Sequence, residues 1–229
     1  MRILIIEDDH IMAKNIELLM RQEKWNAYWT DTGDEGIDLA KIGAYDCIVL
    51  DVKLPDTSGL NVLRSLRQSK VDTPVVVVSG NALIETRVKA LCVGADDYIT
   101  KPFHKDELVA RIRAVVRRAN GHSDSVIVVG DLTVNLDRQT VEVAGKPVCV
   151  TPAEYKIIEL LSMRRGSTLG KQAIMDHLYG GMDEPDEKII DVFVCKLRKK
   201  LAEASKGDTF VSTVWGRGYT IHKAQALAA

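Results

Sequence analysis

The sequence predicts two domains: an α/β domain with a doubly wound, five-stranded parallel sheet, and a smaller domain of antiparallel strands and three helices. Over residues 1–118, short β-branched apolar runs alternate five times with segments of helical periodicity. Beyond residue 125, two-residue alternation replaces this pattern before helical periodicity returns. Between them lies ANGHSDS, a small, polar stretch that is typical of a linker. We therefore expect domains at 1–118 and 126–224, a linker at 119–125 and a tail at 225–229.

The individual elements follow from these periodicities. The strands expected in the first domain are RILII, NAYWT, CIVLD, PVVVVS and DYIT, and the helices after them are IMAKNIELLMRQ, GDEGIDLAKI, GLNVLRSLRQS, IETRVKALCVGA and KDELVARIRAVVRR. In the second domain, residues 126–150 alternate as antiparallel strands, with Gly130 and Asp137 among the turn residues. Helices are expected over PAEYKIIELLSM, GKQAIMDHLYG and EKIIDVFVCKLRKKLAEAS, and two short strands over TFVSTVWGRGYTI.

Composition indicates a globular protein. The 229 residues are 46% hydrophobic and 28% charged, which excludes the disordered and fibrous classes. Apolar runs fall well short of the roughly 20 residues of a membrane helix, so we expect a cytoplasmic protein without a membrane partner. The four cysteines form no C-x-x-C pair, which argues against a zinc site or a disulfide framework. We expect reduced core thiols at Cys47, Cys92, Cys149 and Cys195.

Three acids are predicted to meet at one edge of the parallel sheet. Asp51 directly follows the buried run CIVL, and Glu7 and Asp8 follow RILII. Because the carboxyl ends of parallel strands share an edge, these side chains converge there, where ligands of such sheets bind. Converging carboxylates repel one another unless a cation neutralises them. A hard divalent ion such as Mg²⁺ suits this oxygen-rich set.

Other groups at the same edge indicate phosphoryl chemistry. The fourth strand ends at the hydroxyl of Ser79, and Gly80 follows it with no side chain to obstruct an incoming group. The fifth strand ends at Lys101, where Pro102 stops it. Acids, a hydroxyl, a lysine and a metal together predict an aspartyl-phosphate site with Asp51 as the nucleophile.

The motifs IIEDD, LDVKLPDTSG, VVVSG and ADDYITKPF resemble the receiver domain of two-component response regulators over residues 1–118. The resemblance implies a flavodoxin-like (CheY-like) fold with Asp51 as phosphoacceptor. It implies Mg²⁺ held by Asp8, with Glu7 beside it, by Asp51 and by the backbone carbonyl of Lys53. It also implies a switch made of the Ser79 hydroxyl and the Tyr98 ring, with Lys101 binding the phosphoryl group.

The second half resembles the winged helix-turn-helix output domain of the OmpR/PhoB subfamily, ending in the hairpin TVWGRGYTI. The overall formal charge of −1 means that any nucleic-acid contact needs a local patch. KIIDVFVCKLRKKL supplies one, because its apolar residues recur every three or four positions and its remaining face is basic. The third helix of a winged helix enters the major groove, and a glycine-flanked hairpin tip suits the minor groove.

From this position we expect DNA contacts at particular residues. Phe193 falls among the polar positions of the helix, where contact with a thymine methyl would give it a use. The expected DNA-contact residues are Lys188, Asp191, Val192, Phe193, Lys196, Arg198, Lys199, Thr213, Trp215 and Arg217. The loop YGGMDEP before the helix is expected to contact RNA polymerase, as in the subfamily.

A third set of charges concerns assembly. These residues alternate in sign around the fourth and fifth helices, and in isolation would be surface ion pairs of little energy. In the resembling subfamily this surface forms a symmetric receiver dimer after phosphorylation. The residues are Arg87, Asp96, Asp97, Glu107, Arg111 and Arg118.

The expected function is a transcriptional regulator, not an enzyme, whose Asp51 accepts phosphoryl from a histidine kinase or histidine phosphotransferase. The receivers then pair, and the winged helices bind tandem half-sites on double-stranded DNA. Two alternatives remain open. A haloacid-dehalogenase-type phosphatase also places an aspartate after an apolar strand, but it needs a second acid where Lys53 stands. The other is a receiver whose output domain acts through protein contacts.

Overall fold

The computed structural model describes residues 1–179, 185–205 and 207–222, which form two compact units, Met1–Ala119 and Asn120–Ala229. The tail at 225–229 and most of the loop YGGMDEP lie outside the described residues. Within the described residues, no helix is long and apolar enough to cross a bilayer.

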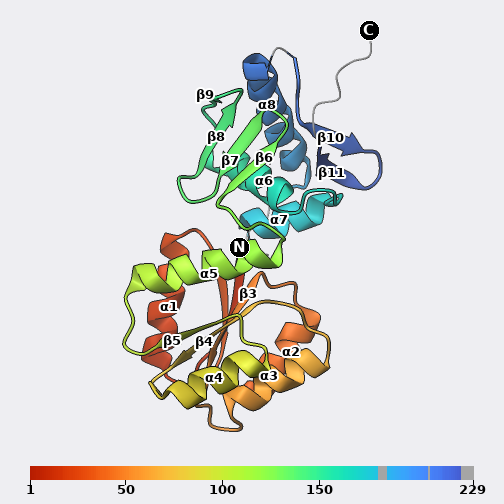
Figure 1. The fold of residues 1–229 in the computed structure, drawn as a ribbon. Helices are drawn as coiled ribbons and strands as arrows, with labels where there is room; N and C mark the ends of the chain where they lie inside the picture. The colour runs from red at the N-terminus through yellow and green to blue at the C-terminus, as the bar shows by residue number, and fades with distance from the viewer. Residues whose placement is uncertain (180–184, 206, 223–229) are drawn as a thin grey trace. The chain divides into compact units, whose positions relative to one another are not determined.

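The N-terminal unit is a five-stranded parallel sheet covered by helices on both faces. Its strands are β1 Arg2–Ile6, β2 Asn26–Thr30, β3 Cys47–Asp51, β4 Val75–Ser79 and β5 Asp97–Thr100, in the order β2-β1-β3-β4-β5. Its helices are α1 His10–Gln22, α2 Gly33–Ile42, α3 Gly59–Gln68, α4 Ile84–Val93 and α5 Lys105–Ala119. Figure 1 shows α1 and α5 on one face of the sheet and α2, α3 and α4 on the other. The doubly wound fold predicted from the sequence is confirmed.

Burial on both faces explains why the central strands read as continuous apolar runs. All five residues of β3 and all five of β4 are buried. Because successive strand residues point to opposite faces, Ile48 and Leu50 pack with Leu63 of α3 while their neighbours face the other layer. The register pairs Asp51 of β3 with Val78 of β4, so the carboxyl ends of these strands lie side by side.

The C-terminal unit joins a sheet, three helices and a hairpin. The sheet consists of β6 Val126–Val129, β7 Leu132–Asn135, β8 Thr140–Val143 and β9 Lys146–Pro147, all antiparallel. The helices are α6 Pro152–Met163, α7 Lys171–Tyr179 and α8 Lys188–Ser205, and β10 Val211–Val214 pairs with β11 Gly218–Ile221. The four-stranded sheet, the three helices and the closing hairpin were all expected from the sequence.

Two expectations about side chains in these elements were wrong. Cys47 is buried, but Cys92, Cys149 and Cys195 are exposed, because they lie on outer helix faces or just after the edge strand β9. Phe193 was expected on the polar face of α8, yet it is half-buried and packs against the core of the C-terminal unit.

Candidate functional site

The acidic edge of the first sheet lies where the order of its strands reverses. β1 has β2 on one side and β3 on the other, so the chain leaves β1 toward one edge of the sheet and later continues toward the opposite edge. Ligands of doubly wound sheets bind in the crevice at this point, beyond the carboxyl ends of the strands. Glu7 and Asp8 follow β1, and Asp51 ends β3, so all three acids stand at this crevice.

The three acids form one cluster with Lys101 at its edge. One carboxylate oxygen from each of Glu7, Asp8 and Asp51 lies within 4.8 Å of the others. The Lys101 Nζ lies 2.7 and 2.8 Å from the two Glu7 oxygens and 2.7 Å from Asp51 Oδ2. Glu7 and Asp51 are buried, whereas Asp8 is exposed to solvent. The cluster therefore presents one open carboxylate and two enclosed ones that share a lysine.

Burial and charge act in opposite directions on this cluster. Desolvation, opposed by the Lys101 hydrogen bond, raises the pKa of Glu7 to about 7, and the Asp51 charge adds to the rise. Desolvation would lower the pKa of Lys101, but its bonds to Asp51 and Glu7 outweigh burial and raise that pKa overall. Lys101 is thus a fixed cation, and further positive charge at the cluster would favour the ionised form of Glu7.

The cluster fits a divalent metal by the chemistry of its donors. Magnesium prefers carboxylate oxygens and retains several waters, which suits two enclosed acids beside an exposed one. The backbone of Lys53, whose carbonyl was expected to add a further ligand, is tied to the site because its N–H donates to Asp51 Oδ1 at 3.1 Å.

The loop after Asp51 is held by close backbone packing and by a helix cap. A Cβ on Gly59 would lie 2.0 Å from the Asp51 carbonyl oxygen, so only glycine allows this approach. Asp56 accepts hydrogen bonds from the N–H groups of Gly33 and Asp34, both at 2.9 Å, at the first turn of α2. These bonds lower the pKa of Asp56. The loop that carries Lys53 is therefore anchored to α2.

Ser79 and Tyr98 are joined through a residue that the sequence did not indicate. The Asn81 N–H donates to Ser79 Oγ at 3.2 Å, and the Asn81 carbonyl accepts from the Tyr98 hydroxyl at 2.7 Å. Its side chain accepts from Leu83 N at 2.9 Å and donates to Thr86 Oγ1 at 3.0 Å. Asn81 thus connects the end of β4, β5 and the first turn of α4. Space around Gly80 is open, since a Cβ there would meet nothing within 4 Å.

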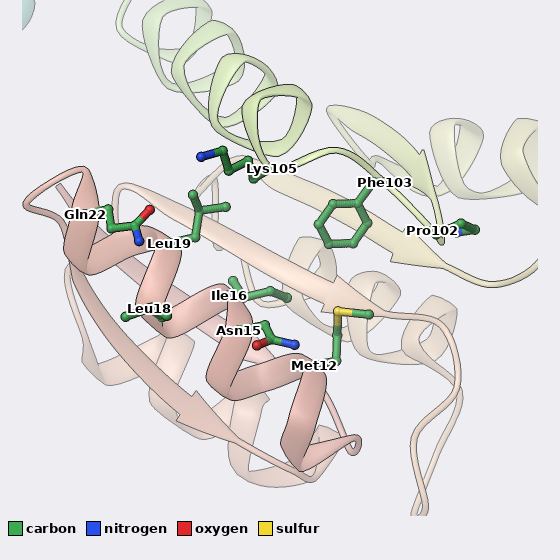
Figure 2. A pocket seen from close by; sticks show the side chains of 9 residues that line it. All are labelled: Met12, Asn15, Ile16, Leu18, Leu19, Gln22, Pro102, Phe103 and Lys105. Carbon is green, nitrogen blue, oxygen red and sulfur yellow. The ribbon is translucent and has the colours of Figure 1, made fainter.

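An apolar pocket of about 340 Å³ lies between α1 and the segment that follows β5. Figure 2 shows Met12 of α1 and Phe103 pointing toward one another across it. Pro102, which follows Lys101, lines one end, and Ile16 and Leu19 contribute further apolar surface. On the same helix, Ile11 and Leu18 are 74% and 57% exposed.

The charges around α4 and α5 are largely paired within the chain. Arg111 bonds to Asp97 Oδ2 at 2.9 Å and to Glu107 Oε1 at 2.8 Å. Asp96 pairs with Arg67 at 3.0 Å and also accepts from Val75 N. Arg118 donates to the Asp96 carbonyl at 3.4 Å, whereas Arg87 is exposed on α4.

An apolar strip accompanies these charges. Ile84, Val88 and Leu91 are 77%, 52% and 44% exposed on α4, and Leu83 just before the helix is 64% exposed. The residues expected at this surface from the sequence were only the charged ones. The apolar strip was not expected, although the segment LIETRVKALCV contains five aliphatic residues besides its cysteine and alanine.

In the C-terminal unit, α8 buries the apolar face that its spacing predicted. Ile190, Val194, Leu197 and Leu201 are buried. The opposite side carries Lys188, Val192, Lys196 and Lys199, all exposed. A basic helix face is therefore open to a partner.

Three of the expected DNA-contact residues already have bonds within the chain. Asp191 pairs with Lys171 at 2.7 Å and accepts a short hydrogen bond from the Tyr219 hydroxyl. Arg198 donates to the Val211 carbonyl at 2.9 Å and to Thr213 Oγ1 at 2.8 Å. The remaining expected contacts, Trp215 and Arg217, lie exposed at the turn of the β10–β11 hairpin, where Trp215 is 91% exposed.

Similarity to known proteins follows the division into two units. Residues 3–113 match the family described as response regulator receiver domain, and residues 145–221 match the family described as transcriptional regulatory protein, C terminal. The cell cycle response regulator CtrA of Brucella ovis is 59% identical over 226 residues, which cover 99% of this chain and 97% of the relative. The chain belongs to the CtrA family of response regulators. CtrA of Brucella anthropi is 58% identical with the same coverage.

Solved structures of receiver domains are similar to this chain over about half of its length. The receiver domain of the Francisella response regulator 1452 has a TM-score of 0.50 and 32% identity, covering 51% of this chain and 97% of its own. A CheY-like receiver domain protein from Methanospirillum hungatei has a TM-score of 0.50 and 27% identity, covering 52% and 96%. The segments KPFHKDE, GHSDSVI and KIIDVFVCKLRKKL resemble that regulator in the sequence itself, and membership of the CtrA family confirms this resemblance.

Proposed function

We propose that the protein is a phosphorylation-dependent, DNA-binding transcriptional regulator whose Asp51 is phosphorylated by a histidine kinase or a histidine phosphotransferase. One observation carries the proposal: three carboxylates within 4.8 Å of one another, with the Lys101 ammonium 2.7 Å from Asp51. Mg²⁺ is the cofactor, held by Glu7, Asp8, Asp51 and the Lys53 carbonyl. The named relatives are cell cycle response regulators, and the genes regulated here are those of the cell cycle. The protein acts in the cytoplasm.

The reaction uses Asp51 as the nucleophile. An Asp51 carboxylate oxygen attacks phosphorus, the new O–P bond forms as the P–N bond of the donor phosphohistidine breaks, and the donor imidazole keeps the electron pair. Mg²⁺ supplies charge neutralisation to the phosphoryl oxygens when it is bound. Lys101 moves its hydrogen bonds from carboxylate to phosphoryl oxygens, and the open space at Gly80 admits the group next to Ser79.

The phosphoryl group signals through Ser79. It adds nearly two negative charges, and the Ser79 hydroxyl turns to donate to it. Rotation of the Ser79 hydroxyl changes the acceptor of the Asn81 N–H. Asn81 is also bonded to the Tyr98 hydroxyl and to the start of α4, so the change reaches both. The surface of α4 is thereby biased toward its paired form.

The phosphodonor docks in the pocket between α1 and Phe103. A donor has to bring its phosphohistidine to Asp51, so its own surface must cover residues next to the acid cluster. Pro102, which lines the pocket, directly follows Lys101, and Met12 on the opposite side lies four residues after Asp8. Ile11 and Leu18 extend the apolar area along α1, which suits an amphipathic helix of the donor.

Two phosphorylated receivers pair through α4 and α5, burying Ile84, Val88 and Leu91 with the charges of Arg87, Asp96, Asp97, Glu107, Arg111 and Arg118 at the rim. Pairing raises the effective concentration of two output domains on adjacent DNA half-sites. The exposed basic face of α8 enters the major groove, Arg217 at the hairpin tip reaches the minor groove, and RNA polymerase is the further partner.

The test is phosphorylation in solution. Acetyl phosphate with Mg²⁺ is expected to phosphorylate the wild-type protein, and intact-mass spectrometry to show one added phosphoryl group. Asp51→Asn is expected to remain unmodified while folded, because its amide is not a nucleophile. Asp97→Asn, which changes an acid outside the cluster, serves as the matched control and is expected to react normally. Equal modification of Asp51→Asn would contradict the assignment, as would full modification in excess chelator.

A further inference from the structure

Asp191 is an acid on the side of α8 that we assign to DNA, where phosphates repel it. Its two oxygens already have partners from two other elements: Lys171 at the first residue of α7, at 2.7 Å, and the hydroxyl of Tyr219 on β11. The Lys171 bond, followed by the Tyr219 bond, lowers the pKa of Asp191. Desolvation and this same carboxylate raise the pKa of Tyr219 to about 12. The carboxylate is thus ionised, neutralised by a lysine and bound to the hairpin.

The hairpin is attached at further points on either side of Tyr219. Leu169, just before α7, exchanges two backbone hydrogen bonds with Tyr219, at 2.8 and 2.9 Å. Gly218 permits this approach, because a Cβ there would lie 2.0 Å from the Leu169 carbonyl oxygen. Arg198 of α8 lies with its guanidinium 5.6 Å from the centre of the Tyr219 ring. Tyr219 is therefore the point where α7, α8 and the hairpin meet.

We propose that Asp191 is a positioning residue, which with Lys171 and Tyr219 fixes the β10–β11 hairpin relative to α8 before DNA arrives. This inference rests on the proposed function in DNA binding and deepens it. A carboxylate can accept from the cytosine amino group in the major groove, which is the role a base contact would give Asp191. Both of its oxygens are already used within the chain, and breaking these bonds leaves Lys171 and Tyr219 without their acceptor.

Fixing the hairpin has a consequence for recognition. Arg217 at the hairpin tip and the basic face of α8 contact neighbouring grooves of one duplex in the proposed complex. The distance between them therefore has to match the spacing of these grooves. A hairpin that is already fixed in the free protein loses little conformational entropy on DNA binding. A mobile hairpin would lose that entropy when the complex forms, which lowers the affinity. Asp191 and Tyr219 therefore contribute to affinity without reading a base.

The experiment compares hairpin protection with DNA binding in the full-length protein. The variants are Asp191→Asn, Asp191→Leu, Lys171→Gln and Tyr219→Phe. Asn keeps an acceptor for the tyrosine hydroxyl, and Leu does not. Glu203→Gln is the matched control, since it removes a carboxylate charge from the same helix at an exposed side chain outside the proposed DNA-contact set. Hydrogen exchange of residues 211–221 is measured without DNA, and thermal midpoints check the fold. Base preference is measured by selection from a randomised duplex pool.

Tyr219→Phe and Asp191→Leu are expected to speed exchange of the hairpin by roughly threefold to tenfold, the range of one lost hydrogen bond. Asp191→Asn is expected to show an intermediate hairpin exchange rate, and Glu203→Gln the same rate as wild type. In Tyr219→Phe and Asp191→Leu, the affinity for DNA is expected to fall without a change in base preference. Adding Arg217→Gln to Asp191→Leu then costs less than Arg217→Gln alone, because a loose hairpin has already lost part of its contact. If Asp191→Leu does not fold, Tyr219→Phe with Arg217→Gln carries the same test.

A change of preference at one base pair with unaltered hairpin exchange would overturn the proposal, as would full additivity of Arg217→Gln with Asp191→Leu and Tyr219→Phe. If the wild-type protein selects no DNA sequence, the proposed function fails, and hairpin exchange still decides whether Asp191 and Tyr219 hold the hairpin.

Discussion

At the scale of single residues, Asn81 connects the end of β4 next to the acid cluster with β5 and α4. Its backbone meets Ser79 and Tyr98, and its side chain holds the first turn of α4 through Leu83 and Thr86. Substitution by alanine keeps the backbone bonds and removes only those to α4. The two halves of this connection can therefore be separated by one mutation.

We predict that Asn81→Ala leaves phosphorylation of Asp51 within about threefold of wild type but weakens the dimerisation that follows. Loss of a capping side chain costs about 1 kcal/mol, which is enough to loosen the first turn of α4. Sedimentation velocity on the phosphorylated protein measures the effect. Asn61→Ala, which removes an exposed asparagine bonded to Arg64 on α3, is expected to dimerise normally. Equal dimerisation of both variants would show that Asn81 does not transmit the change.

A second residue-scale prediction concerns His177 of α7. This side chain is buried, its Nε2 has no hydrogen-bond partner among the described residues, and desolvation holds its pKa well below 6.5. Because the folded pKa is depressed, the unfolded chain takes up the proton first as pH falls below about 6.5, and stability is lost in that range. At pH 5.5 the loss of unfolding free energy relative to pH 7.5 reaches at most about 1.4 kcal/mol from this group.

Denaturant unfolding of the C-terminal unit at the two pH values measures this loss. His177→Leu is expected to remove it, whereas replacement of the exposed His104 by Asn leaves it unchanged. A variant His177→Leu with the same pH dependence as wild type would contradict the assignment.

At the scale of elements, Asp56 shows how the loop after the phosphoacceptor is secured. Its carboxylate caps α2 from a different segment of the chain, and the cap residue of α2 itself, Thr32, makes no side-chain hydrogen bond to the helix. We predict that Asp56→Ala lowers the unfolding free energy by about 1 kcal/mol and slows phosphorylation, because the loop carrying Lys53 loses its anchor. Thermal unfolding and acetyl phosphate kinetics measure the two effects. Asp72→Ala, an exposed loop acid, is the control, and equal behaviour of the two variants would refute this role.

Element identity could be predicted from local patterns, because apolar spacing fixes which face is buried. The buried set of α8 and the acid-bearing ends of β1 and β3 both follow from such spacing. Partners of polar side chains could not, because they depend on contacts between distant segments. Asp191 and Arg198 looked like free charges on a basic helix. Only the tertiary fold brings Lys171 and Tyr219 to Asp191, and Thr213 to Arg198. Asp56 and Asn81 gave no sequence signal for the same reason.

At the scale of the whole molecule, the paired charges of α5 change the expectation for the dimer. Arg111 and Asp97 bond to each other within one chain. In the proposed dimer we therefore expect them to contribute rim contacts after re-pairing, and the exposed apolar strip of α4 to supply the main driving force. Ile84 has the most exposed side chain of this strip, at 77%.

We predict that Ile84→Glu abolishes phosphorylation-dependent dimerisation while Asp51 is still modified, since an acid in a buried apolar contact is strongly unfavourable. Ile42→Glu on α2 is the matched control, because Ile42 is 87% exposed and lies outside α4 and α5. Sedimentation velocity before and after acetyl phosphate gives the masses. A dimer that persists in Ile84→Glu, or that is lost equally in Ile42→Glu, would place the interface elsewhere.

The proposed function requires that phosphorylation of Asp51 increase binding to paired DNA half-sites, which equilibrium binding to a selected duplex measures. The duplex carries two direct half-sites about 10 to 10.5 base pairs apart, so that both α8 helices address one face. With acetyl phosphate and Mg²⁺, the affinity of wild type is expected to rise by at least about tenfold. Asp51→Asn is expected to show no rise in affinity. Wild type is also expected to show none on a duplex with five base pairs inserted between the half-sites. An equal rise for Asp51→Asn, or none for wild type, would contradict the account.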